Sequence, residues 1–329
     1  FKQKTAYEIG VRLVGSEMCI RDSTGGMTAN VLSGGAGADT LDGRGGNDTL
    51  DGGAGIDTAT YANATGVVAV DLSAGTATDG EGGTDTLTSI ENLRGGAYAD
   101  TLTGDGADNI LYGGGGDDAL SGGTGADKLY GEAGVDTLEG GEGNDYLAGG
   151  TENDTLRGQG GVDSMAGQQG DDVLYGGDGN DVLYGDDTTS TYLGNDTLYG
   201  EAGADTLYGG YGDDALYGGA GADNLLGRQG ADTFVFQGAS AFGAVDTVAD
   251  FSLAQMDRID VTDILNGFYD PMTHAISDFV RITESGANSV LAVDQNGGGD
   301  SFVTIATLSG VTGLTDEAAL VASGNLIVS

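Results

Sequence analysis

Aspartate recurs with a spacing of nine residues over long stretches of this chain. The members of the series are Asp39, Asp48, Asp57, Asp100, Asp118, Asp127, Asp136, Asp145, Asp154, Asp163, Asp172, Asp181, Asp196, Asp205, Asp214, Asp223 and Asp232. A carboxylate at such a position can bind a cation, or it can favour a turn by accepting a hydrogen bond from its own backbone. Turn formation accounts for a single aspartate, but it does not explain a series in phase.

Glycine accompanies these aspartates in a nine-residue repeat, G-G-x-G-x-D-x-U-x, in which U is apolar. Residues 122–130 (GGTGADKLY) and 176–184 (GGDGNDVLY) show the pattern clearly. Glycine at positions 1, 2 and 4 permits backbone angles that a side chain would forbid, so the first six residues are expected to form a tight turn. The last three residues then form a short strand whose middle side chain points inward.

Two nonapeptides close one coil of 18 residues, which contains two turns and two strands. Stacked coils produce two parallel sheets, and the U residues, such as Leu138, fill the thin core between them. Stacking by 18 residues places Asp118 beside Asp136 and Asp127 beside Asp145. We therefore predict an all-β chain, a parallel β-roll (a solenoid) of stacked 18-residue coils with a small β-rich C-terminal capping domain.

Carboxylates that are stacked one strand spacing apart repel one another unless a cation neutralises them. Calcium is a hard cation that takes about six to eight oxygen ligands at about 2.3–2.6 Å. The glycine turns supply backbone carbonyls, and each aspartate supplies a carboxylate between two coils. The spacing therefore predicts that multiple Ca²⁺ ions are bound by the seventeen aspartates of the series.

These residues resemble the calcium-binding RTX repeats of the hemolysin-type family, which fold as a parallel β-roll. The resemblance covers most of residues 34–235, and it implies that the calcium ligands are the position-6 aspartates and the carbonyls of the glycine turns. Asn109 departs from the pattern because it replaces an aspartate, and Tyr98, Ala107 and Glu152 replace the fourth glycine. Calcium sites that use these turns are expected to be defective.

Charge and composition exclude several classes of protein. The chain has 329 residues, of which 52 are acidic, 11 are Lys or Arg and 66 are Gly, and its net charge is −41. A chain this acidic repels phosphates, so we expect no nucleic-acid partner. It has no run of about 18 apolar residues, so we expect no transmembrane segment. A single cysteine makes neither a disulfide framework nor a zinc cluster.

The first 23 residues differ from the rest. They carry four of the 11 basic residues and the only cysteine, Cys19, and they contain no repeat. Glu8 and Arg12 interrupt any apolar core that a signal peptide would need. The segment resembles the conceptual translation of a sequencing adapter, and a genuine linker is the alternative. We therefore expect residues 1–23 to be a non-native artefact, with the true N-terminus missing.

The repeats fall into two blocks. Residues 24–60 form the first RTX block, and residues 95–235 form the main RTX block of fifteen nonapeptides, with a six-residue insertion near Thr188–Leu193. The spacer between them, residues 61–94, has strand-like runs at Val67–Leu72 and Thr86–Ile90. We expect the spacer to continue the roll as an irregular coil, and a binding loop is the alternative.

Tyrosine occupies the ninth position of several repeats. The register places Tyr175, Tyr199 and Tyr217 on one outer sheet face, and Tyr184 and Tyr208 on the other. Stacking between neighbouring strands explains such a row of good β-formers. Contact with a cell surface or a glycan is the alternative.

The glycine periodicity ends at Val235, and in residues 236–329 apolar and polar residues alternate as in ordinary strands. Strands are predicted at 279–283, 289–294 and 302–308. Thr315, followed by two acidic residues, predicts the start of a helix over 318–322, and Gly324 predicts its end.

The segments Asp246–Phe251 and Asp257–Val261, together with the end of the chain from Ala319 to Val328, resemble the C-terminal target domain of type I secretion substrates. The resemblance implies an uncleaved secretion signal and a type I secretion exporter as a partner. The physical alternative is a cap that covers the open end of the roll, and both roles can hold together.

Together these features predict a calcium-binding RTX module that folds on export. It would carry the type I secretion signal of a larger secreted bacterial protein, which would be extracellular or associated with the cell surface. No residues of the chain predict catalysis. The alternatives are the tail of a secreted hydrolase, a protease or lipase, with its catalytic domain upstream, or part of an RTX adhesin or surface-layer protein.

Overall fold

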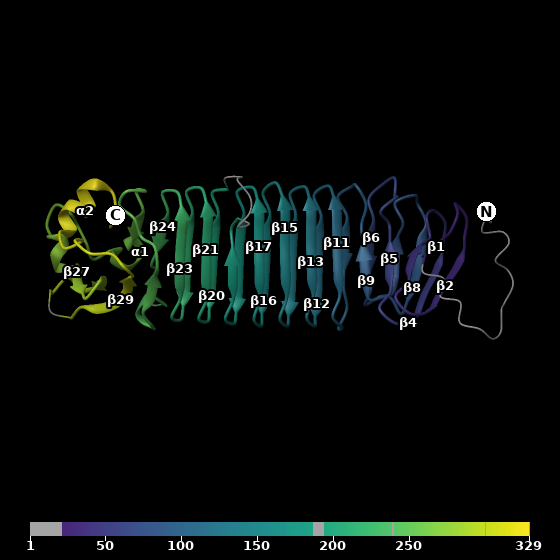
Figure 1. Ribbon diagram of the computed structural model, residues 1–329, viewed down its shortest axis with the longest axis horizontal. Helices are drawn as coiled ribbons and strands as arrows, with labels where there is room; N and C mark the ends of the chain where they lie inside the picture. The colour runs from purple at the N-terminus through teal and green to yellow at the C-terminus, as the bar shows by residue number, and fades with distance from the viewer. Residues whose placement is uncertain (1–21, 187–193, 239, 300, 329) are drawn as a thin grey trace. The chain divides into compact units, whose positions relative to one another are not determined.

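The structure is a computed structural model that describes residues 22–186, 194–238, 240–299 and 301–328. The chain forms two compact units, residues 1–150 and 151–329, and each unit is described by itself. Both consist mainly of short parallel strands joined by turns (Figure 1). Within the described ranges, no helix is long and apolar enough to cross a membrane.

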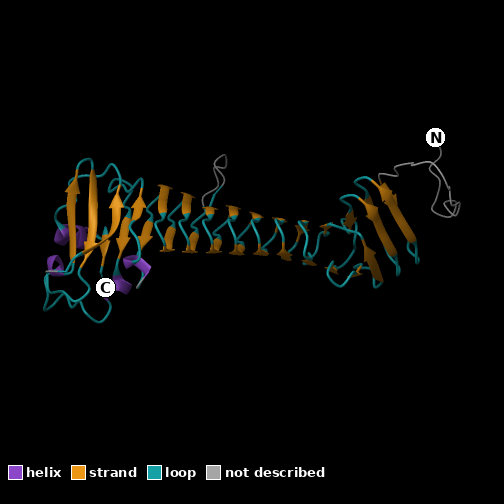
Figure 2. Cartoon of the chain, turned by 90° about the horizontal axis from the view of Figure 1, so that it is seen from below, coloured by secondary structure: helices purple, strands orange, loops and turns teal. Residues whose placement is uncertain are grey.

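Two sheets make up the first unit. One sheet holds, in spatial order, β1 (Asp22–Thr24), β3 (Thr40–Asp42), β5 (Thr58–Thr60), β9 (Asn92–Arg94), β11 (Ile110–Gly115), β13 (Lys128–Ala133) and β15 (Tyr146–Thr151). The other holds β2 (Val31–Ala36), β4 (Thr49–Ala54), β8 (Thr84–Thr88), β7 (Thr76–Thr78), β6 (Ala69–Asp71), β10 (Thr101–Thr103), β12 (Ala119–Thr124) and β14 (Thr137–Glu142). Each repeat coil gives one strand to each sheet, and the two rows of strands face each other in Figure 2.

The pairing register confirms the 18-residue coil. Leu120 pairs with Leu138 on the neighbouring parallel strand of one sheet, and Leu111 pairs with Leu129 in the other. The apolar residue of each repeat is buried between the sheets, and Leu147 is fully inaccessible. The core of the roll is therefore one thin layer of mostly leucine side chains, as the repeat predicts.

The N-terminal boundary predicted at residue 23 lies inside β1. Asp22 pairs with Thr40, and Ser23 pairs with Leu41, in a parallel ladder. The end of the segment that was expected to be foreign therefore takes part in the first sheet. The rest of that segment, including Cys19, lies outside the described residues.

The spacer differs from the predicted irregular coil because it inserts an antiparallel meander into one sheet. Strands β6, β7 and β8 pair antiparallel to one another. The outer members of the meander then pair in parallel with repeat strands, β8 with β4 and β6 with β10. Gly75, at φ 65°, permits the tight connection between β6 and β7. The two predicted strand runs are found as β6 and β8.

The second unit also has two sheets. One holds, in spatial order, β17 (Ser164–Gln169), β19 (Val182–Tyr184), β21 (Thr206–Tyr211), β23 (Asn224–Gln229), β25 (Asp246–Val248), β29 (Val303–Leu308), β28 (Asn288–Val293) and β27 (Val280–Ser285). The other holds β16 (Thr155–Gly160), β18 (Val173–Asp178), β20 (Thr197–Ala202), β22 (Ala215–Ala220), β24 (Thr233–Val235), β26 (Arg258–Asp260) and β30 (Leu326–Ile327). Leu174 pairs with Leu198 across the coil that contains the predicted insertion, while the insertion itself lies outside the described residues.

Stacked strands continue past Val235, where the glycine repeats end. β25 pairs in parallel with β23, and β26 pairs in parallel with β24. The predicted strands at 279–283, 289–294 and 302–308 are found as β27, β28 and β29, and β27 pairs antiparallel with β28. The end of the glycine periodicity therefore does not mark the end of the stacked strands.

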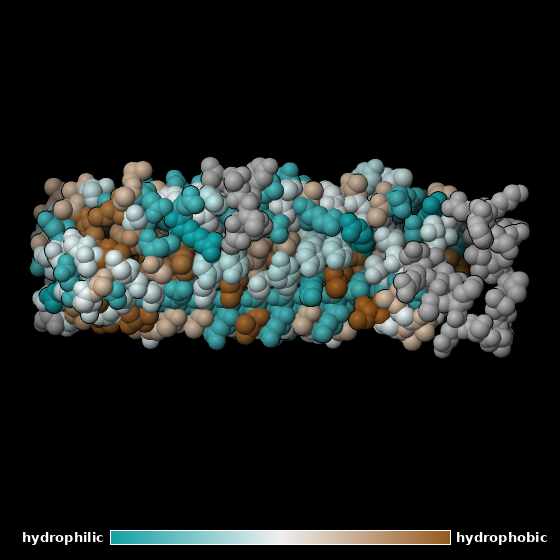
Figure 3. All heavy atoms as spheres, in the orientation of Figure 1, coloured by the Kyte–Doolittle hydropathy of each residue, from teal (hydrophilic) through white to brown (hydrophobic). Residues whose placement is uncertain are grey.

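Short helices complete the C-terminal segment. They are η2 (Ser240–Phe242), α1 (Thr262–Leu265), η3 (Ile276–Asp278) and α2 (Glu317–Ser323). The side chain of Asp316, rather than that of the predicted Thr315, accepts a hydrogen bond from the Ala319 N–H at the start of α2. Gly324, at φ 80°, ends the helix as predicted. Hydrophilic residues cover most of the face drawn in Figure 3, and larger brown patches lie over the C-terminal segment.

Candidate metal centre

The glycine turns hold each position-6 aspartate directly before a strand. Gly143, at the fourth position of its turn, has φ 136°, and a Cβ there would overlap the carbonyl oxygen of Gly125 in the preceding coil. Only glycine combines this backbone angle with so close an approach of two coils. All seventeen predicted aspartates are buried, each at the end of such a turn or of its degenerate equivalent.

One oxygen of each carboxylate is fixed by the neighbouring coil. The N–H of Asp100 donates to Oδ1 of Asp118 at 2.7 Å, and the N–H of Asp118 donates to Oδ1 of Asp136 at 2.7 Å. On the opposite edge, the N–H of Asp127 donates to Oδ1 of Asp145 at 2.8 Å. The predicted neighbours, Asp118 with Asp136 and Asp127 with Asp145, are therefore brought together in two columns.

The second unit repeats this arrangement. The N–H of Asp154 donates to Oδ1 of Asp172 at 2.7 Å, and the N–H of Asp205 donates to Oδ1 of Asp223 at 2.9 Å. Across the lengthened coil, the N–H of Asp172 donates to Oδ1 of Asp196 at 2.8 Å, at a separation of 24 residues. The column thus keeps its hydrogen-bond pattern even where the repeat length changes.

The other oxygen of many column aspartates is buried without a hydrogen-bond partner. Among the described residues, this holds for Oδ2 of Asp39, Asp48, Asp57, Asp118, Asp127, Asp172, Asp181, Asp196, Asp205, Asp214, Asp223 and Asp232. A buried carboxylate oxygen without a partner costs several kcal/mol unless a cation or a proton satisfies it. These atoms are therefore the strongest sign of a ligand that lies within the roll.

Backbone carbonyls converge on the same atoms. A Cβ built on Gly122 would collide with both Oδ2 of Asp127 and the carbonyl oxygen of Gly140 in the next coil. A Cβ on Gly200 would collide in the same way with Oδ2 of Asp205 and the carbonyl oxygen of Gly218. The small space beside the first glycine of a turn is therefore bordered by oxygens from two coils.

Burial raises the pKa of the column carboxylates. The pKa of Asp118 rises to about 7 and that of Asp172 to about 8, first because burial removes water and then because other carboxylates lie close by. For the same reasons the pKa of Asp214 rises to about 9. In the described part of the chain, none of these three forms an ion pair with Lys or Arg. These three carboxylates therefore have no basic side chain beside them to offset their charge when they ionise.

The donor set suits calcium. Among the described residues, no group of three or more His, Cys, Asp or Glu side chains is arranged as a metal site. A cation in the columns would therefore take one or two carboxylates and complete its shell with backbone carbonyls. Hard oxygen ligands of this kind, without nitrogen or sulfur, favour Ca²⁺ over transition metals.

Asp100 differs from the other members of its column. Its Oδ1 accepts the N–H of Val68 at 2.7 Å, and its Oδ2 accepts the N–H of Gly96 at 2.6 Å. Both oxygens are therefore engaged by backbone donors. Of the predicted ligands, Asp100 is the one whose surroundings resemble a cation site least.

The structure also reveals a repeat that the sequence pattern missed. Residues 80–88 (GEGGTDTLT), in the spacer, place Asp85 at the sixth position, and the N–H of Asp48 donates to its Oδ1 at 2.9 Å. Asp85 is fully buried, and its Oδ2 accepts the Tyr61 hydroxyl at 3.1 Å. Glu91 takes the same position on the opposite edge, where its Oε2 accepts the N–H of Asp57 at 2.8 Å. The glycines, Asp85 and Leu87 of this segment stand at the repeat spacing, and this spacing could have identified the repeat from the sequence.

Two further aspartates extend the columns beyond Val235. The N–H of Asp223 donates to Oδ1 of Asp246 at 3.0 Å, and the N–H of Asp232 donates to Oδ1 of Asp257 at 3.2 Å. Oδ2 of Asp257 accepts the N–H of Ser252 at 2.7 Å. No glycine turn precedes these residues, so the repeat pattern gave no reason to select them.

The columns of the first unit are interrupted at two neighbouring places. Val68 stands where a sixth-position carboxylate would precede Asp100, since its N–H binds Asp100 and its carbonyl accepts the N–H of Thr101. Asn109 fills the sixth position on the other edge, where its Oδ1 accepts the Asp105 N–H and its Nδ2 donates to the Glu91 carbonyl. Neither side chain carries a charge. The carboxylates before residue 95 are thus separated from those after residue 110.

The tyrosines stack on one another as the register predicts. Tyr199 lies between Tyr175, at 4.9 Å between ring centroids, and Tyr217, at 4.5 Å. On the other sheet, Tyr184 stacks on Tyr208 at 4.8 Å. Because each of these rings stacks on at least one neighbour, and Tyr199 on two, cross-strand stacking accounts for these residues. A role in surface or glycan contact stays a prediction.

Comparison with known proteins identifies the same nine-residue repeat. The family described as RTX calcium-binding nonapeptide repeat (4 copies) matches at residues 24–59, 88–120, 112–147, 121–156, 139–174, 157–192, 190–225 and 199–234, which together cover more than half of the chain. No curated protein matches the chain.

Among solved structures, the chain is similar to the solution structure of the AlgE6R3 subunit from the Azotobacter vinelandii mannuronan C5-epimerase. The identity is 31%, the match covers 46% of this chain and 80% of that one, and the TM-score is 0.31. The family match rests on the same turns and aspartates that build the two columns. The chain therefore belongs to the family of proteins built from RTX calcium-binding nonapeptide repeats.

Proposed function

We propose that this chain is the calcium-folded part of a larger secreted bacterial protein, that it folds only after export, and that it carries a type I secretion signal near its C-terminus. The observation that carries the proposal is the set of buried Oδ2 atoms without protein partners. The family match supports calcium as the cation that binds there.

The position-6 aspartates would hold the calcium ions together with carbonyls of the adjoining glycine turns. Calcium would supply two positive charges between coils whose carboxylates otherwise repel. Oδ1 accepts the N–H of the neighbouring coil and Oδ2 would bind the cation, so one side chain would link coil packing to metal binding. Asp85 occupies the position of a repeat aspartate beside Asp48, but it is not proposed as a ligand, because its Oδ1 accepts the Asp48 N–H and its Oδ2 accepts the Tyr61 hydroxyl.

Calcium binding would then act as a folding switch. A chain with a net charge of −41 and 66 glycines pays a high entropy cost on folding, repels itself and has a thin core. Binding energy therefore becomes folding energy. Extracellular calcium modules have dissociation constants of about 10⁻⁴–10⁻³ M, so the chain would stay unfolded at cytosolic calcium and fold outside the cell.

Circular dichroism during a calcium titration of chelator-treated protein tests the switch. We expect β-structure to appear steeply, with a Hill coefficient above one. A full β spectrum in excess chelator would refute the proposal.

Asp118→Asn tests the assigned ligands. The variant keeps an Oδ1 acceptor for the Asp100 N–H but removes the charge at Oδ2. Asp117→Asn is the matched control, because Asp117 is exposed and its Oδ1 accepts a hydrogen bond from the Val135 N–H of the next coil. We expect Asp118→Asn to raise the calcium midpoint and Asp117→Asn to leave it near the wild-type value. Equal midpoints for the two variants would show that the ligands are assigned wrongly.

The secretion signal is proposed from the resemblance of Asp246–Phe251, Asp257–Val261 and the end of the chain to type I target domains. Removing residues 270–329 should keep the chain inside a host that carries a matching type I exporter. Removing residues 95–148, which are three whole coils, should leave export intact. Export of the first variant, or retention of both, would place the signal elsewhere.

A further inference from the structure

The spacer builds a cleft against the first repeats of the chain. The cleft has a volume of about 300 Å³ and is bordered by four separate segments. Met27 comes from the first turn, Arg44 follows β3, Tyr61 follows β5, and Glu81 lies in the loop between β7 and β8. None of the seventeen repeat aspartates lines it, so the calcium columns do not explain this feature.

The floor of the cleft is held rigidly. Tyr61 is 3% exposed, and its hydroxyl donates to Oδ2 of Asp85 at 3.1 Å. Asp79 is fully buried and accepts the N–H groups of Gly46, at 3.0 Å, and Gly83, at 2.8 Å. Hydrogen bonds within the protein therefore hold the floor in place, and a preorganised floor lowers the entropic cost of binding.

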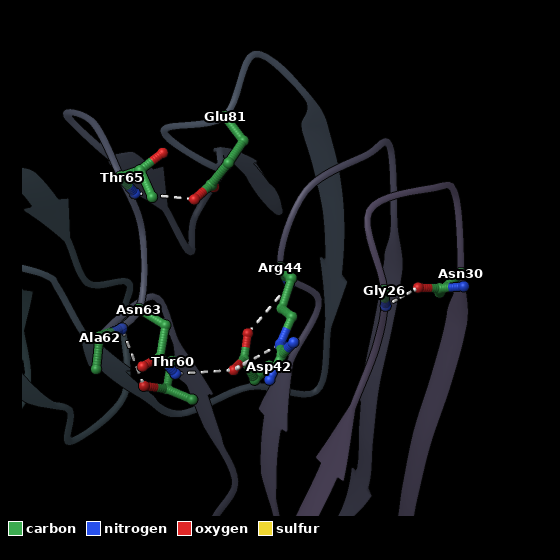
Figure 4. A network of polar contacts seen from close by, with 9 residues as sticks. All are labelled: Gly26, Asn30, Asp42, Arg44, Thr60, Ala62, Asn63, Thr65 and Glu81. Carbon is green, nitrogen blue, oxygen red and sulfur yellow. Dashed lines mark hydrogen bonds and ion pairs between the residues drawn. The ribbon is translucent and has the colours of Figure 1, made fainter. Parts of the chain in front are cut away.

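Donors and acceptors face each other across the opening. Figure 4 shows Asp42, Arg44 and Asn63 on one side and Thr65 with Glu81 on the other. Asn63 Nδ2 donates to Oδ2 of Asp42 at 3.2 Å, and Glu81 Oε1 accepts the Thr65 N–H at 2.8 Å.

Arg44 keeps donors available to a ligand. Its Nε lies 3.9 Å from Oδ2 of Asp42, beyond hydrogen-bond range, and its side chain is 52% exposed. The rim thus combines a guanidinium and an amide with two carboxylates.

We propose that this cleft binds a neutral, hydroxyl-rich ring of monosaccharide size. Each sugar hydroxyl both donates and accepts, which matches a rim that offers donors at Arg44 and acceptors at Glu81. An anion would be repelled by the surrounding carboxylates, and a cation would leave the donors of Arg44 unused. The volume lies at the lower end of small-ligand pockets. Met27 and Ala64 give the C–H face of a sugar ring an apolar contact.

The proposal does not rest on secretion or on the assignment of individual calcium ligands, but it needs the folded roll. The experiment is therefore performed in saturating calcium, with folding checked by circular dichroism for every variant. The probes are the methyl glycosides of glucose, galactose and mannose, followed by backbone NMR shifts or calorimetry. Tetramethylammonium and glucuronate serve as the cationic and anionic comparisons.

We expect saturable binding of at least one glycoside, with a dissociation constant of about 1 mM, and shifts confined to the cleft. Arg44→Ala should weaken glycoside binding about tenfold, because the loss of a hydrogen bond to a charged group lowers the affinity by about that factor. Arg157→Ala is the matched control, because it removes an arginine that stacks on Tyr175 in the other unit. Asn63→Ala provides a second variant if Arg44→Ala fails to fold.

Three outcomes would overturn the proposal. They are the absence of glycoside binding, glycoside binding that is equal in Arg44→Ala and Arg157→Ala, and stronger binding of tetramethylammonium or glucuronate at the same residues. A chain that folds with calcium but shows one of these results would leave the calcium proposal intact and remove only this one.

Discussion

The backbone N–H of Asp181 donates a 2.8 Å hydrogen bond to Oδ1 of Asp205, although 24 residues and the lengthened coil separate them. Oδ2 of both carboxylates is buried without a protein partner. One oxygen thus joins two coils, and the other has no protein partner. If calcium binds as proposed, the same side chains determine both the stability of the stack and its affinity for calcium.

Calcium affinity should become weaker as the pH is lowered. In the folded chain without calcium, the pKa of Asp118 is about 7, whereas it is about 3.9 in an unfolded chain. The folded state therefore holds more protons between these values. The contribution of Asp118 to the stability of the calcium-free roll is fully present below about pH 4 and is lost as the pH rises through about 7. Calcium must displace these protons.

Calorimetry at pH 8, 7 and 6 measures this competition. We expect the dissociation constant for calcium to rise each time the pH is lowered, and we expect calcium binding to release protons. An affinity that stays constant from pH 8 to pH 6 would contradict the raised pKa values.

Two glycines at the same repeat position should tolerate alanine differently. Gly37 and Gly55 both have positive φ, 121° and 150°, but a Cβ on Gly55 would overlap the carbonyl oxygen of Gly37, whereas nothing lies within 4 Å of a Cβ on Gly37. Gly37→Ala should cost the backbone strain, roughly 1–2 kcal/mol. Gly55→Ala should cost roughly 1–3 kcal/mol more, because a well-packed site is overfilled. Urea denaturation in saturating calcium measures the difference, and equal losses would argue against close coil packing.

The interruption at Val68 and Asn109 should divide calcium-dependent folding into two steps. The carboxylates of Asp48 and Asp57 precede the interruption, and those of Asp118 and Asp127 follow it. Hydrogen exchange at increasing calcium should show β4 and β5 becoming protected at a different concentration from β11 and β12.

Asn109→Asp restores a carboxylate at the interruption and should bring the two transitions closer together. Asp105→Asn, which changes the charge of the same turn at another position, is the control and should leave the two transitions apart. A single transition in the wild-type chain would show that the neutral positions do not interrupt the coupling.

The tyrosine stack should contribute measurably to stability. Tyr199 has a ring on each face, and each aromatic pair is worth about 0.5–1.5 kcal/mol. Tyr199→Ala should therefore lower the free energy of unfolding by roughly 1–3 kcal/mol, whereas Tyr199→Phe should stay within about 0.5 kcal/mol of wild type. Tyr98→Ala, at a residue that is 43% exposed, is the control. If Tyr199→Phe is as unstable as Tyr199→Ala, the hydroxyl rather than the ring is responsible.

The regular part of this molecule could be predicted from the sequence. The nine-residue period gives the turn, the inward leucine and the neighbour one coil away, because each is a local consequence of glycine angles and strand alternation. Asp118 beside Asp136, and Tyr175 beside Tyr199, follow from counting residues. The helix that starts at Asp316 and ends at Gly324 follows from capping preferences that are equally local.

Other features required the tertiary structure because they depend on segments that are distant in the sequence or lack the repeat. Asp85 joins the column because the β6–β7–β8 meander carries its turn back against Asp48, a pairing that no local pattern encodes. Asp246 and Asp257 occupy column positions without a glycine turn, because pairing with β23 and β24 rather than local backbone angles holds them. The sequence alone determined where carboxylates recur, since that is a matter of spacing. Only the folded chain decided which of their oxygens bind backbone N–H groups and which are buried without a partner, because this depends on how neighbouring coils pack.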